Sequence, residues 1–233
     1  IITTEDINVP AWLQLMIDSF WPLLSAGLIF TVPLTLITFV LGIVLGLSVA
    51  LARLYGPAPL VMLVRFYVWL IRGTPLLVQL FLIFYGLPSA GIVLDAFTAA
   101  VIGFTLNIGA YSSEIIRATL AAIPKGQWEA AYSIGMNWPQ VMWRVILPQA
   151  ARIAVPPLSN TFISLVKDTS LAAAVTVPEL FQAAQRLASV TYEPLILYVE
   201  TALIYLLFSS VLSTLQDKLE QRLAYKETRE VAL

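Results

Sequence analysis

Polar and ionisable residues within long apolar stretches are the functional candidates in this chain, because a charge surrounded by lipid is costly unless it meets a partner or a ligand. Nine candidates fall into three groups: Arg72, Gly73 and Thr74; Asn107, Tyr111 and Glu114; and Thr161, Ser164 and Asp168. Guanidinium and carboxylate groups bind charged ends of a zwitterion, and amides and hydroxyls add hydrogen bonds. These residue types indicate recognition of a small polar solute along a membrane pathway.

The first group interrupts an apolar stretch. Pro75 follows it and removes a backbone donor, while Gly73 loosens the helix, so nearby carbonyls and amides become free. Broken helices of this kind often form the binding sites of transporters. Arg72 would bind an α-carboxylate with both arms of its guanidinium. The alternative is that Arg72 pairs with Glu114 or reaches the cytoplasmic surface.

The second group forms a polar face on a helix. Asn107, Tyr111 and Glu114 follow an i, i+4, i+7 spacing, which places them on one side. A polar face on an apolar helix is expected to turn toward a pathway or a partner helix. Glu114 would suit an α-ammonium group, or else it pairs with Arg117 or with Arg72.

The third group follows an i, i+3, i+7 spacing. Thr161, Ser164 and Asp168 therefore also share one face, with Asn160 and Lys167 beside them. This face is predicted to run toward the outer end of a transmembrane helix, where it lines the translocation cavity or closes an outer gate. The alternative is a seam of hydrogen bonds between helices.

The composition sets the class of protein to which these residues belong. Of 233 residues, 59% are hydrophobic and only 12% charged, with a mean hydropathy of +0.86. A soluble domain carries about 25% charged residues, so the composition indicates a polytopic membrane protein. Cysteine and histidine are both absent. Their absence excludes a disulfide, a thiol redox centre and a histidine-based metal or acid–base site, and we expect no catalytic and no metal-binding residue.

The elements that must position the candidates are membrane-spanning helices. The sequence predicts an all-α membrane protein with five transmembrane helices, at 25–52, 61–87, 96–116, 150–177 and 195–215. A short interfacial helix at 16–21 is expected to precede the first of them.

The distribution of basic residues predicts the orientation of these helices. Lysine and arginine gather after the first, third and fifth helices: Arg53, Arg65, Arg117, Lys125, Arg144, Arg152, Lys218, Arg222, Lys226 and Arg229. The remaining loops carry only Arg186, and the N-terminus is acidic, with Glu5, Asp6 and Asp18. By the positive-inside rule, the N-terminus lies outside, and the loop at about 125–148 and the C-terminus lie in the cytoplasm.

The cytoplasmic loop at 125–148 carries a motif of its own. A helix is predicted from about 126 to 138, followed by a second element that begins at Pro139. The motif residues are Glu129, Ala130, Ala131, Gly135, Leu147 and Pro148. In type and spacing they resemble the signature loop of the membrane subunits of ABC importers, which docks a separate ATPase. An amphipathic helix lying on the membrane surface is the alternative interpretation.

Further motifs narrow the resemblance to the polar amino acid permeases of this superfamily. They comprise Arg72-Gly73-Thr74-Pro75, Asn107-Ile108-Gly109-Ala110-Tyr111 and Lys167-Asp168-Thr169-Ser170. The last of these motifs and the Tyr85-Gly86-Leu87-Pro88 turn are most similar to the cystine permeases. Basic amino acid permeases tend to carry an acidic residue where Thr161 stands, so the resemblance favours a zwitterionic substrate.

The resemblance implies a type I ABC importer permease fold, with residues 1–233 as a single transmembrane domain and a cytoplasmic coupling helix. It also implies an inner membrane location in a bacterium. The expected partners are an ATPase dimer that binds ATP and Mg, a second permease copy or sister permease, an extracytoplasmic substrate-binding protein and the lipid bilayer. No cofactor within this chain and no nucleic acid are expected.

The sequence gives no indication of an enzyme. No Gly-x-x-x-x-Gly-Lys-Ser/Thr phosphate loop is present, so ATP hydrolysis is expected in a separate polypeptide. The function predicted is that of a permease subunit that moves a polar amino acid, cystine or another zwitterion, into the cytoplasm by alternating access. The alternative is a secondary amino acid transporter that needs no ATPase.

Overall fold

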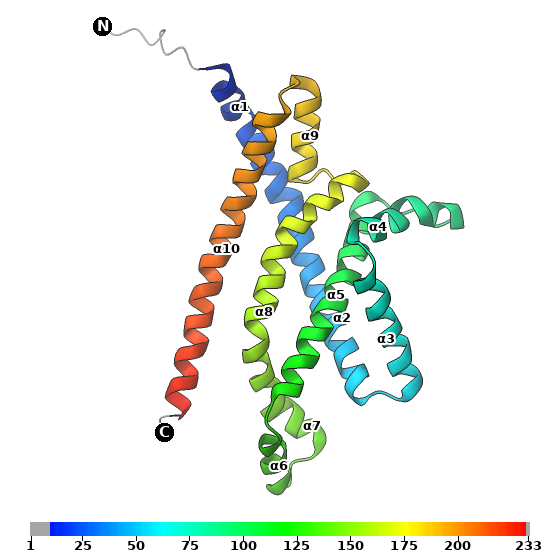
Figure 1. The fold of residues 1–233 in the computed structure, drawn as a ribbon, viewed down its shortest axis with the longest axis vertical. Coiled ribbons are helices and arrows are strands. Elements are labelled where there is room, and N and C mark those ends of the chain that lie inside the picture. Colours follow the sequence, from blue (N-terminus) through cyan, green and yellow to red (C-terminus); the bar gives the residue numbers. More distant parts are fainter. Residues whose placement is uncertain (1–9, 232–233) are drawn as a thin grey trace.

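The computed structural model describes residues 10–231, with side chains described for 10–222 (Figure 1). Glu5 and Asp6, which entered the prediction of orientation, lie outside the described residues, as do the side chains of Lys226 and Arg229. The described chain contains helices and no β-strand.

The principal helices are α1 (Ala11–Ala26), α2 (Val32–Tyr55), α3 (Ala58–Gly73), α4 (Leu76–Phe81), α5 (Ala96–Ala122), α6 (Lys125–Ser133), α7 (Trp138–Val141), α8 (Leu147–Asp168), α9 (Leu180–Thr191) and α10 (Pro194–Val231). Short segments of other helical types connect them: π-helical η1 (Gly27–Thr31), η2 (Leu82–Gly86) and η4 (Met142–Ile146), and 3₁₀-helical η3 (Leu87–Ala90) and η5 (Thr169–Val175).

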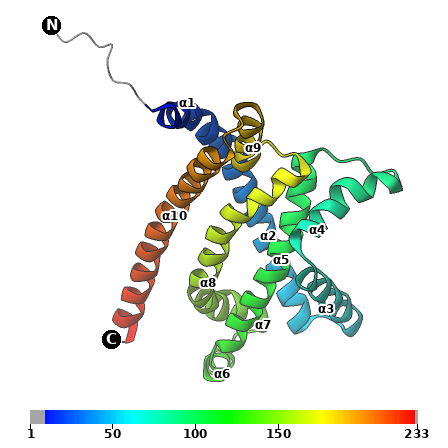
Figure 2. The ribbon, with the colours of Figure 1, turned by 45° about the horizontal axis from the view of Figure 1, so that its top comes forward.

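The long helices α2, α5, α8 and α10 run along the length of the molecule (Figure 1). The helices α6 and α7 lie at one end, and α9 lies at the other. The described chain starts at the α9 end of the bundle and finishes toward the α6 end (Figure 1). Figure 2 shows α3 and α4 projecting from the side of the bundle opposite α10.

Three helical stretches are long and apolar enough to cross a membrane: Ala11–Tyr55, Ala96–Ala122 and Pro194–Arg222. A fourth crossing arises if Ala58–Gly73 and Leu76–Ala90, which meet at a bend of 107°, are taken as one broken span. The remaining predicted span corresponds to α8, which is too polar to qualify by composition because the third candidate group and Arg152 lie on it.

The predicted separate interfacial helix at 16–21 is wrong, because Ala11–Tyr55 is one helical run of 45 residues. At 1.5 Å per residue such a run is about 68 Å long, roughly twice the ~30 Å hydrocarbon core of a bilayer. The segment at 16–21 is therefore continuous with the first span rather than a helix of its own.

Each π-helical segment precedes a proline by the same interval. Pro33, Pro88 and Pro148 stand two positions after the last residue of η1, η2 and η4, respectively. Proline has no N–H to donate to the carbonyl four residues back, and its ring clashes with that carbonyl. A wider π turn moves the carbonyl aside and lets the helix continue. The chain continues as α2 after Pro33 and as α8 after Pro148, whereas Pro88 lies in the 3₁₀ segment that ends at Ala90.

The centre of the bundle is the close packing of α2 against α5. Gly42 and Gly46, one turn apart on α2, face α5, and a Cβ on Gly42 would lie 2.5 Å from the side chain of Ile108. A Cβ on Gly109 of α5 would lie 2.6 Å from Leu45. Glycines at four-residue spacing allow helix backbones to approach closely in membranes, where packing rather than the hydrophobic effect drives association. The close packing of α2 against α5 thus holds the polar face of α5 in place.

The α9 end is held together by a buried acidic side chain. Glu179 is fully buried and accepts hydrogen bonds from the backbone N–H groups of Phe181 and Gln182, which cap α9. The hydroxyl of Tyr205 on α10 donates to the same carboxylate at 2.7 Å. Burial raises the pKa of Glu179, although these hydrogen bonds act in the opposite direction. The carboxylate therefore ties α9 to α10.

Candidate functional site

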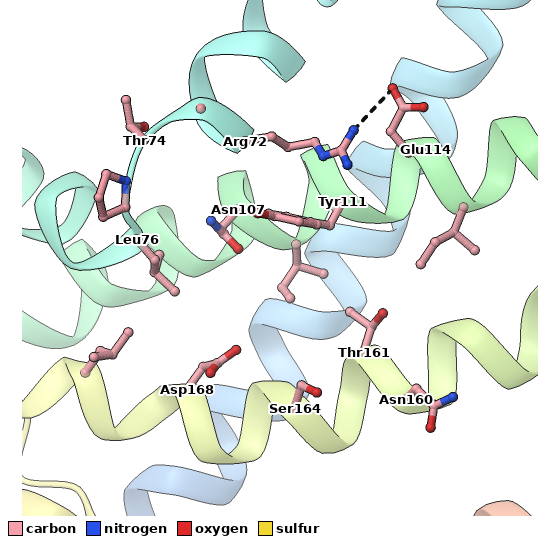
Figure 3. A pocket seen from close by; sticks show the side chains of 15 residues that line it. Arg72, Thr74, Leu76, Asn107, Tyr111, Glu114, Asn160, Thr161, Ser164 and Asp168 are labelled. Atoms are coloured by element: carbon pink, nitrogen blue, oxygen red, sulfur yellow. Dashed lines mark ion pairs between the residues drawn. The ribbon is translucent and has the colours of Figure 1, made fainter.

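All nine residues predicted to form the substrate pathway line one cavity of about 790 Å³. Helix α3 and the following break contribute Arg72, Gly73 and Thr74, α5 contributes Asn107, Tyr111 and Glu114, and α8 contributes Thr161, Ser164 and Asp168. Figure 3 shows the polar side chains of α5 and α8 facing each other across this space. The cavity also has an apolar part, which the sequence analysis did not assign to the substrate pathway: Pro75, Leu76, Ile108, Ile115 and Leu171.

The break between α3 and α4 forms one wall of the cavity. The helix ends at Gly73, and Thr74 and Pro75 take extended backbone conformations before α4 begins. The amide of Gln79 donates hydrogen bonds to the carbonyl oxygens of Ile71, at 2.7 Å, and Thr74, at 3.0 Å. These carbonyls have no donor within a continuing helix, so Gln79 supplies the hydrogen bonds that the bend of 107° removes.

Replacing Gln79 with leucine is expected to destabilise the broken span. The substitution leaves two backbone carbonyls without their donor, at a cost of about 2 kcal/mol, or a fall in melting temperature of roughly 4–8 °C for a chain of this length. Thermal unfolding of the purified protein in detergent measures the effect. The exposed Gln185 of α9 supplies the control variant Gln185→Leu, and equal melting temperatures for the two variants would contradict the role of Gln79.

Glu114 is the centre of an ion-pair cluster. Its carboxylate accepts hydrogen bonds from the guanidinium groups of Arg53 on α2 and Arg117 on α5, the latter at 3.0 Å. Arg72 lies more loosely, with its Nη1 atom 3.8 Å from Oε1 of Glu114 (Figure 3). The pairs with Arg72 and Arg117 were alternatives in the sequence analysis, whereas the pair with Arg53 was not foreseen. Because three cations surround it, this carboxylate is poorly suited to receive the α-ammonium group proposed for it.

Arg72 keeps donors available on the cavity side. Its side chain is 43% exposed, compared with 17% for Arg53, and its guanidinium lies 5.2 Å from the ring centroid of Tyr111. A cation over an aromatic face is attracted by the ring. The stacked ring positions the guanidinium while leaving its N–H groups for a carboxylate in the cavity.

Several polar groups of the cavity have no hydrogen-bond partner in the described part of the chain. The side chains of Asn107, Ser164 and Asp168 are in this state, whereas the hydroxyl of Thr161 donates to the carbonyl of Pro157 at 2.9 Å. No ion pair within 4.0 Å joins Asp168 to the neighbouring Lys167. Asn107 is half-buried and Ser164 and Asp168 are exposed to the cavity, so the three side chains are available to a solute.

The loop at 125–148 folds as two short helices at the α6 end of the bundle (Figure 1). The predicted end of the first helix, at about 138, is wrong, because α6 ends at Ser133. Gly135 adopts a positive φ of 79°, a conformation that favours glycine and stops the helix. Asn137 and Gln140 then form a capping box that starts α7.

The motif residues of this loop divide into two sets. Glu129, Ala130 and Gly135 are exposed, and no side-chain partner of Glu129 is found among the described residues. Ala131 is only 4% exposed and belongs to an apolar cluster with Ile116 of α5, against which Leu147 also packs. Ala131 therefore fixes α6 to the bundle, while Glu129 and Ala130 remain open to a partner.

Two functional features escaped the sequence analysis. The pairing of Arg53 with Glu114 joins residues 61 positions apart, and no local pattern carries that information. Gln79 lies in an apolar stretch five residues after the break. A lone amide at that place is a usable signal, since broken membrane helices need donors for their free carbonyls.

Comparisons with known proteins agree with these observations. Residues 42–225 match the family model described as binding-protein-dependent transport system inner membrane component. The chain is 52% identical over 211 residues to the L-cystine transport system permease protein TcyB of Bacillus subtilis (strain 168), covering 90% of each chain. It is 34% identical over 206 residues to the arginine transport system permease protein ArtQ of the same organism, covering 87% of this chain and 93% of the relative.

Solved structures show the same fold. An amino acid ABC transporter, crystallised with histidines, contains a chain that superposes with a TM-score of 0.84 at 36% identity, covering 90% of this chain and 97% of that one. The MetNI methionine ABC transporter in an inward-facing conformation gives a TM-score of 0.74 at 22% identity, covering 88% and 98%. The second likeness concerns the fold alone.

Proposed function

Since the chain belongs to the family of binding-protein-dependent transport system inner membrane components, we propose that it carries cystine or another zwitterionic amino acid into the cytoplasm. It is an inner-membrane permease subunit of an amino acid ABC importer, and not an enzyme. The observation that carries the proposal of substrate is the cavity lined by all nine candidate residues. Its polar groups suit a zwitterion, and the relative at 52% identity is a cystine permease.

The two charged ends of the amino acid have separate places in this cavity. Arg72 is the group for the α-carboxylate, because its guanidinium is exposed to the cavity and only loosely paired with Glu114. Asp168 is the group for the α-ammonium, because it lines the cavity without a hydrogen-bond partner among the described residues. This assignment replaces Glu114 as the ammonium site and leaves it the structural role of holding the arginine cluster together.

The remaining groups select the side chain of the substrate. Asn107 and Ser164 add hydrogen bonds from opposite walls, and Thr161 places a neutral residue where an acid would favour a cationic side chain. Cystine carries no net charge at neutral pH, and its two amino acid heads occupy more length than one. A cavity of about 790 Å³ has room for such a ligand.

The complete importer consists of two permeases, an ATPase dimer and an extracytoplasmic substrate-binding protein. Residues 1–233 form one transmembrane domain with five spans, in which α8 is the fourth, and the N-terminus lies outside. Each ATPase subunit holds ATP with Mg and grips the exposed Glu129 end of α6. Binding of ATP draws the two α6 helices together and opens the cavity outward, and hydrolysis resets it, because ATP binds one state more tightly than the other.

The test is uptake of labelled cystine into proteoliposomes that contain this chain, its ATPase and its binding protein. We expect uptake that requires ATP, is blocked by unlabelled cystine and is unaffected by arginine. Uptake without the ATPase would instead indicate a secondary transporter. ATP-driven uptake of another amino acid, but not of cystine, in the same vesicles would contradict the proposed substrate and leave the importer intact.

Replacing Thr161 with glutamate is expected to make arginine a competitor. The new carboxylate adds a negative charge to the α8 wall of the cavity, two turns before Asp168, and attracts a cationic side chain. An attraction of about 1–2 kcal/mol lowers the inhibition constant of arginine by roughly 5–30-fold. Competition against labelled cystine measures the change. Ser189→Glu on the exposed face of α9 adds the same charge outside the cavity. Unchanged competition by arginine in Thr161→Glu would show that Thr161 does not face the substrate.

A further inference from the structure

A second cavity, of about 430 Å³, lies beside the first between α2, α3 and α5. It shares Arg72, Gly73, Tyr111 and Glu114 with the first cavity, and Arg53, Arg65, Val68 and Trp69 complete its lining. Four of its lining residues, Arg65, Val68, Trp69 and Arg72, lie on α3. The four residues that line only the second cavity have no role in the proposed substrate pathway.

The charge of the second cavity is unbalanced. Its lining contains three arginines and one acid, Glu114, whose carboxylate is already bonded to Arg53 and to Arg117 outside the lining. Arg65 makes no ion pair or hydrogen bond within the described part of the chain. The cavity therefore keeps at least one guanidinium group, and part of the charge of Arg72, without a matching anion.

Arg65 lies in the middle of α3, one half of the bent helix pair that is apolar enough to form a broken span, and an unpaired charge within a span is costly. It is seven residues along α3 from Ala58, or about 10 Å at 1.5 Å per residue. Arg72 stands seven residues further on and shares its face of the helix. Charged residues at such depths pair with one another, with backbone carbonyls or with an ion pathway. An anion from outside the chain would complete this site.

The surface next to Arg65 is apolar. Met62, Phe66 and Trp69 of the same helix are 77%, 57% and 68% exposed. A basic pocket between membrane helices with an apolar surface beside it is the arrangement that binds anionic lipid head groups, since guanidinium groups take the phosphate while the acyl chains cover the apolar side chains. A free phosphate ion would bind the arginines and leave these three side chains unused.

We propose that the cavity lined by Arg53, Arg65 and Arg72 binds the phosphate of an anionic phospholipid, whose acyl chains lie along Met62, Phe66 and Trp69. The site differs from the substrate cavity in that Arg65 lies outside that cavity, while Arg72 lines both. A lipid bound here adds a second anion to the arginine cluster, in the cavity that Glu114 also lines. It thereby makes the ion pairs next to the substrate cavity dependent on membrane composition.

The test is the binding of phosphatidylglycerol to the full chain purified with its ATPase in detergent, measured by native mass spectrometry. Arg65→Gln removes the unpaired cation and leaves the partners of Glu114 in place. We expect it to raise the dissociation constant about fivefold, the value for one arginine near anionic lipid. Arg65→Lys keeps the charge and should retain most of the affinity. Arg186→Gln, on exposed α9, is the matched control and should bind as the wild type does.

Three results would overturn the proposal. Equal affinity for phosphatidylcholine would show that no anionic group is recognised. Equal affinity of Arg65→Gln and Arg186→Gln would place the lipid elsewhere, for instance because a second permease covers α3. Displacement of phosphatidylglycerol by millimolar inorganic phosphate would assign the site to free phosphate rather than to lipid. Retention of lipid in the presence of phosphate, together with the loss in Arg65→Gln, supports the proposal.

Discussion

Uptake driven by ATP is expected to fall at least about tenfold when Glu129 is replaced with lysine, while ATP hydrolysis by the associated ATPase continues. Glu129 is exposed on α6 and has no side-chain partner among the described residues, so its carboxylate is free for a basic group on the ATPase. Reversing one charge of a pair in an interface costs about 2–5 kcal/mol, which exceeds a factor of ten in binding. Transport and phosphate release, measured in the same proteoliposomes, separate the two activities.

The control for Glu129→Lys is Asp217→Lys, because Asp217 is also an exposed acid, on α10 rather than on α6. This variant should transport as the wild type does. Gly135→Trp is expected to reproduce the uncoupling by another route, since a tryptophan at a φ of 79° would strain the turn that ends α6. Normal uptake by both Glu129→Lys and Gly135→Trp would contradict the assignment of α6 as the coupling helix.

The second large effect is expected at Glu114. Replacing it with glutamine removes the one carboxylate that Arg53, Arg72 and Arg117 share, and leaves three cations facing one another. Breaking a largely buried ion pair from one side costs on the order of 3 kcal/mol, or roughly 6–12 °C in melting temperature. The side chain of Glu114 is only 22% exposed, so solvent compensates little. Thermal unfolding in detergent measures the loss.

Arg72→Gln distinguishes structure from substrate binding in the same cluster. Its contact with Glu114 is 3.8 Å long and its side chain is 43% exposed, so the melting temperature should change by far less than in Glu114→Gln. Uptake of cystine should nevertheless fall, because the variant lacks the guanidinium that binds the α-carboxylate. A melting temperature of Glu114→Gln equal to that of the wild type would show that the cluster does not stabilise the fold.

The residues that line the cavity could be predicted because local spacing encodes them. Intervals of three, four and seven place Asn107 with Glu114, and Thr161 with Asp168, on single helix faces whatever the tertiary packing. The break between α3 and α4 could be predicted for an equally local reason, because Pro75 has no backbone N–H to continue the helix. The fold was predicted from the family resemblance, and the comparisons with known proteins show the same family and fold.

The features that could not be predicted depend on packing between distant segments. Whether Glu114 meets Arg53 is decided by the approach of α2 to α5, which Gly42 and Gly46 permit. The end of α6 at Ser133 depends on the backbone conformation of Gly135, and the sequence alone also allowed that glycine within a longer helix. The number of membrane-spanning helices does not follow from hydropathy alone, because the polar face of α8 lowers the mean hydropathy of that helix.

The polarity of α8 also bears on how the chain enters the membrane. A helix that carries Arg152 and Asp168 as well as Pro156 and Pro157 partitions poorly into lipid by itself, since a charged residue at the centre of a helix adds about 2.5–3.5 kcal/mol to insertion through the translocon. The helices that pack against α8 are α2 and α5, which are synthesised earlier, and α10, which follows it. Insertion of α8 is thus an assembly step, in which a helix too polar to qualify as a span by composition meets α2 and α5 first and is covered by α10 afterwards.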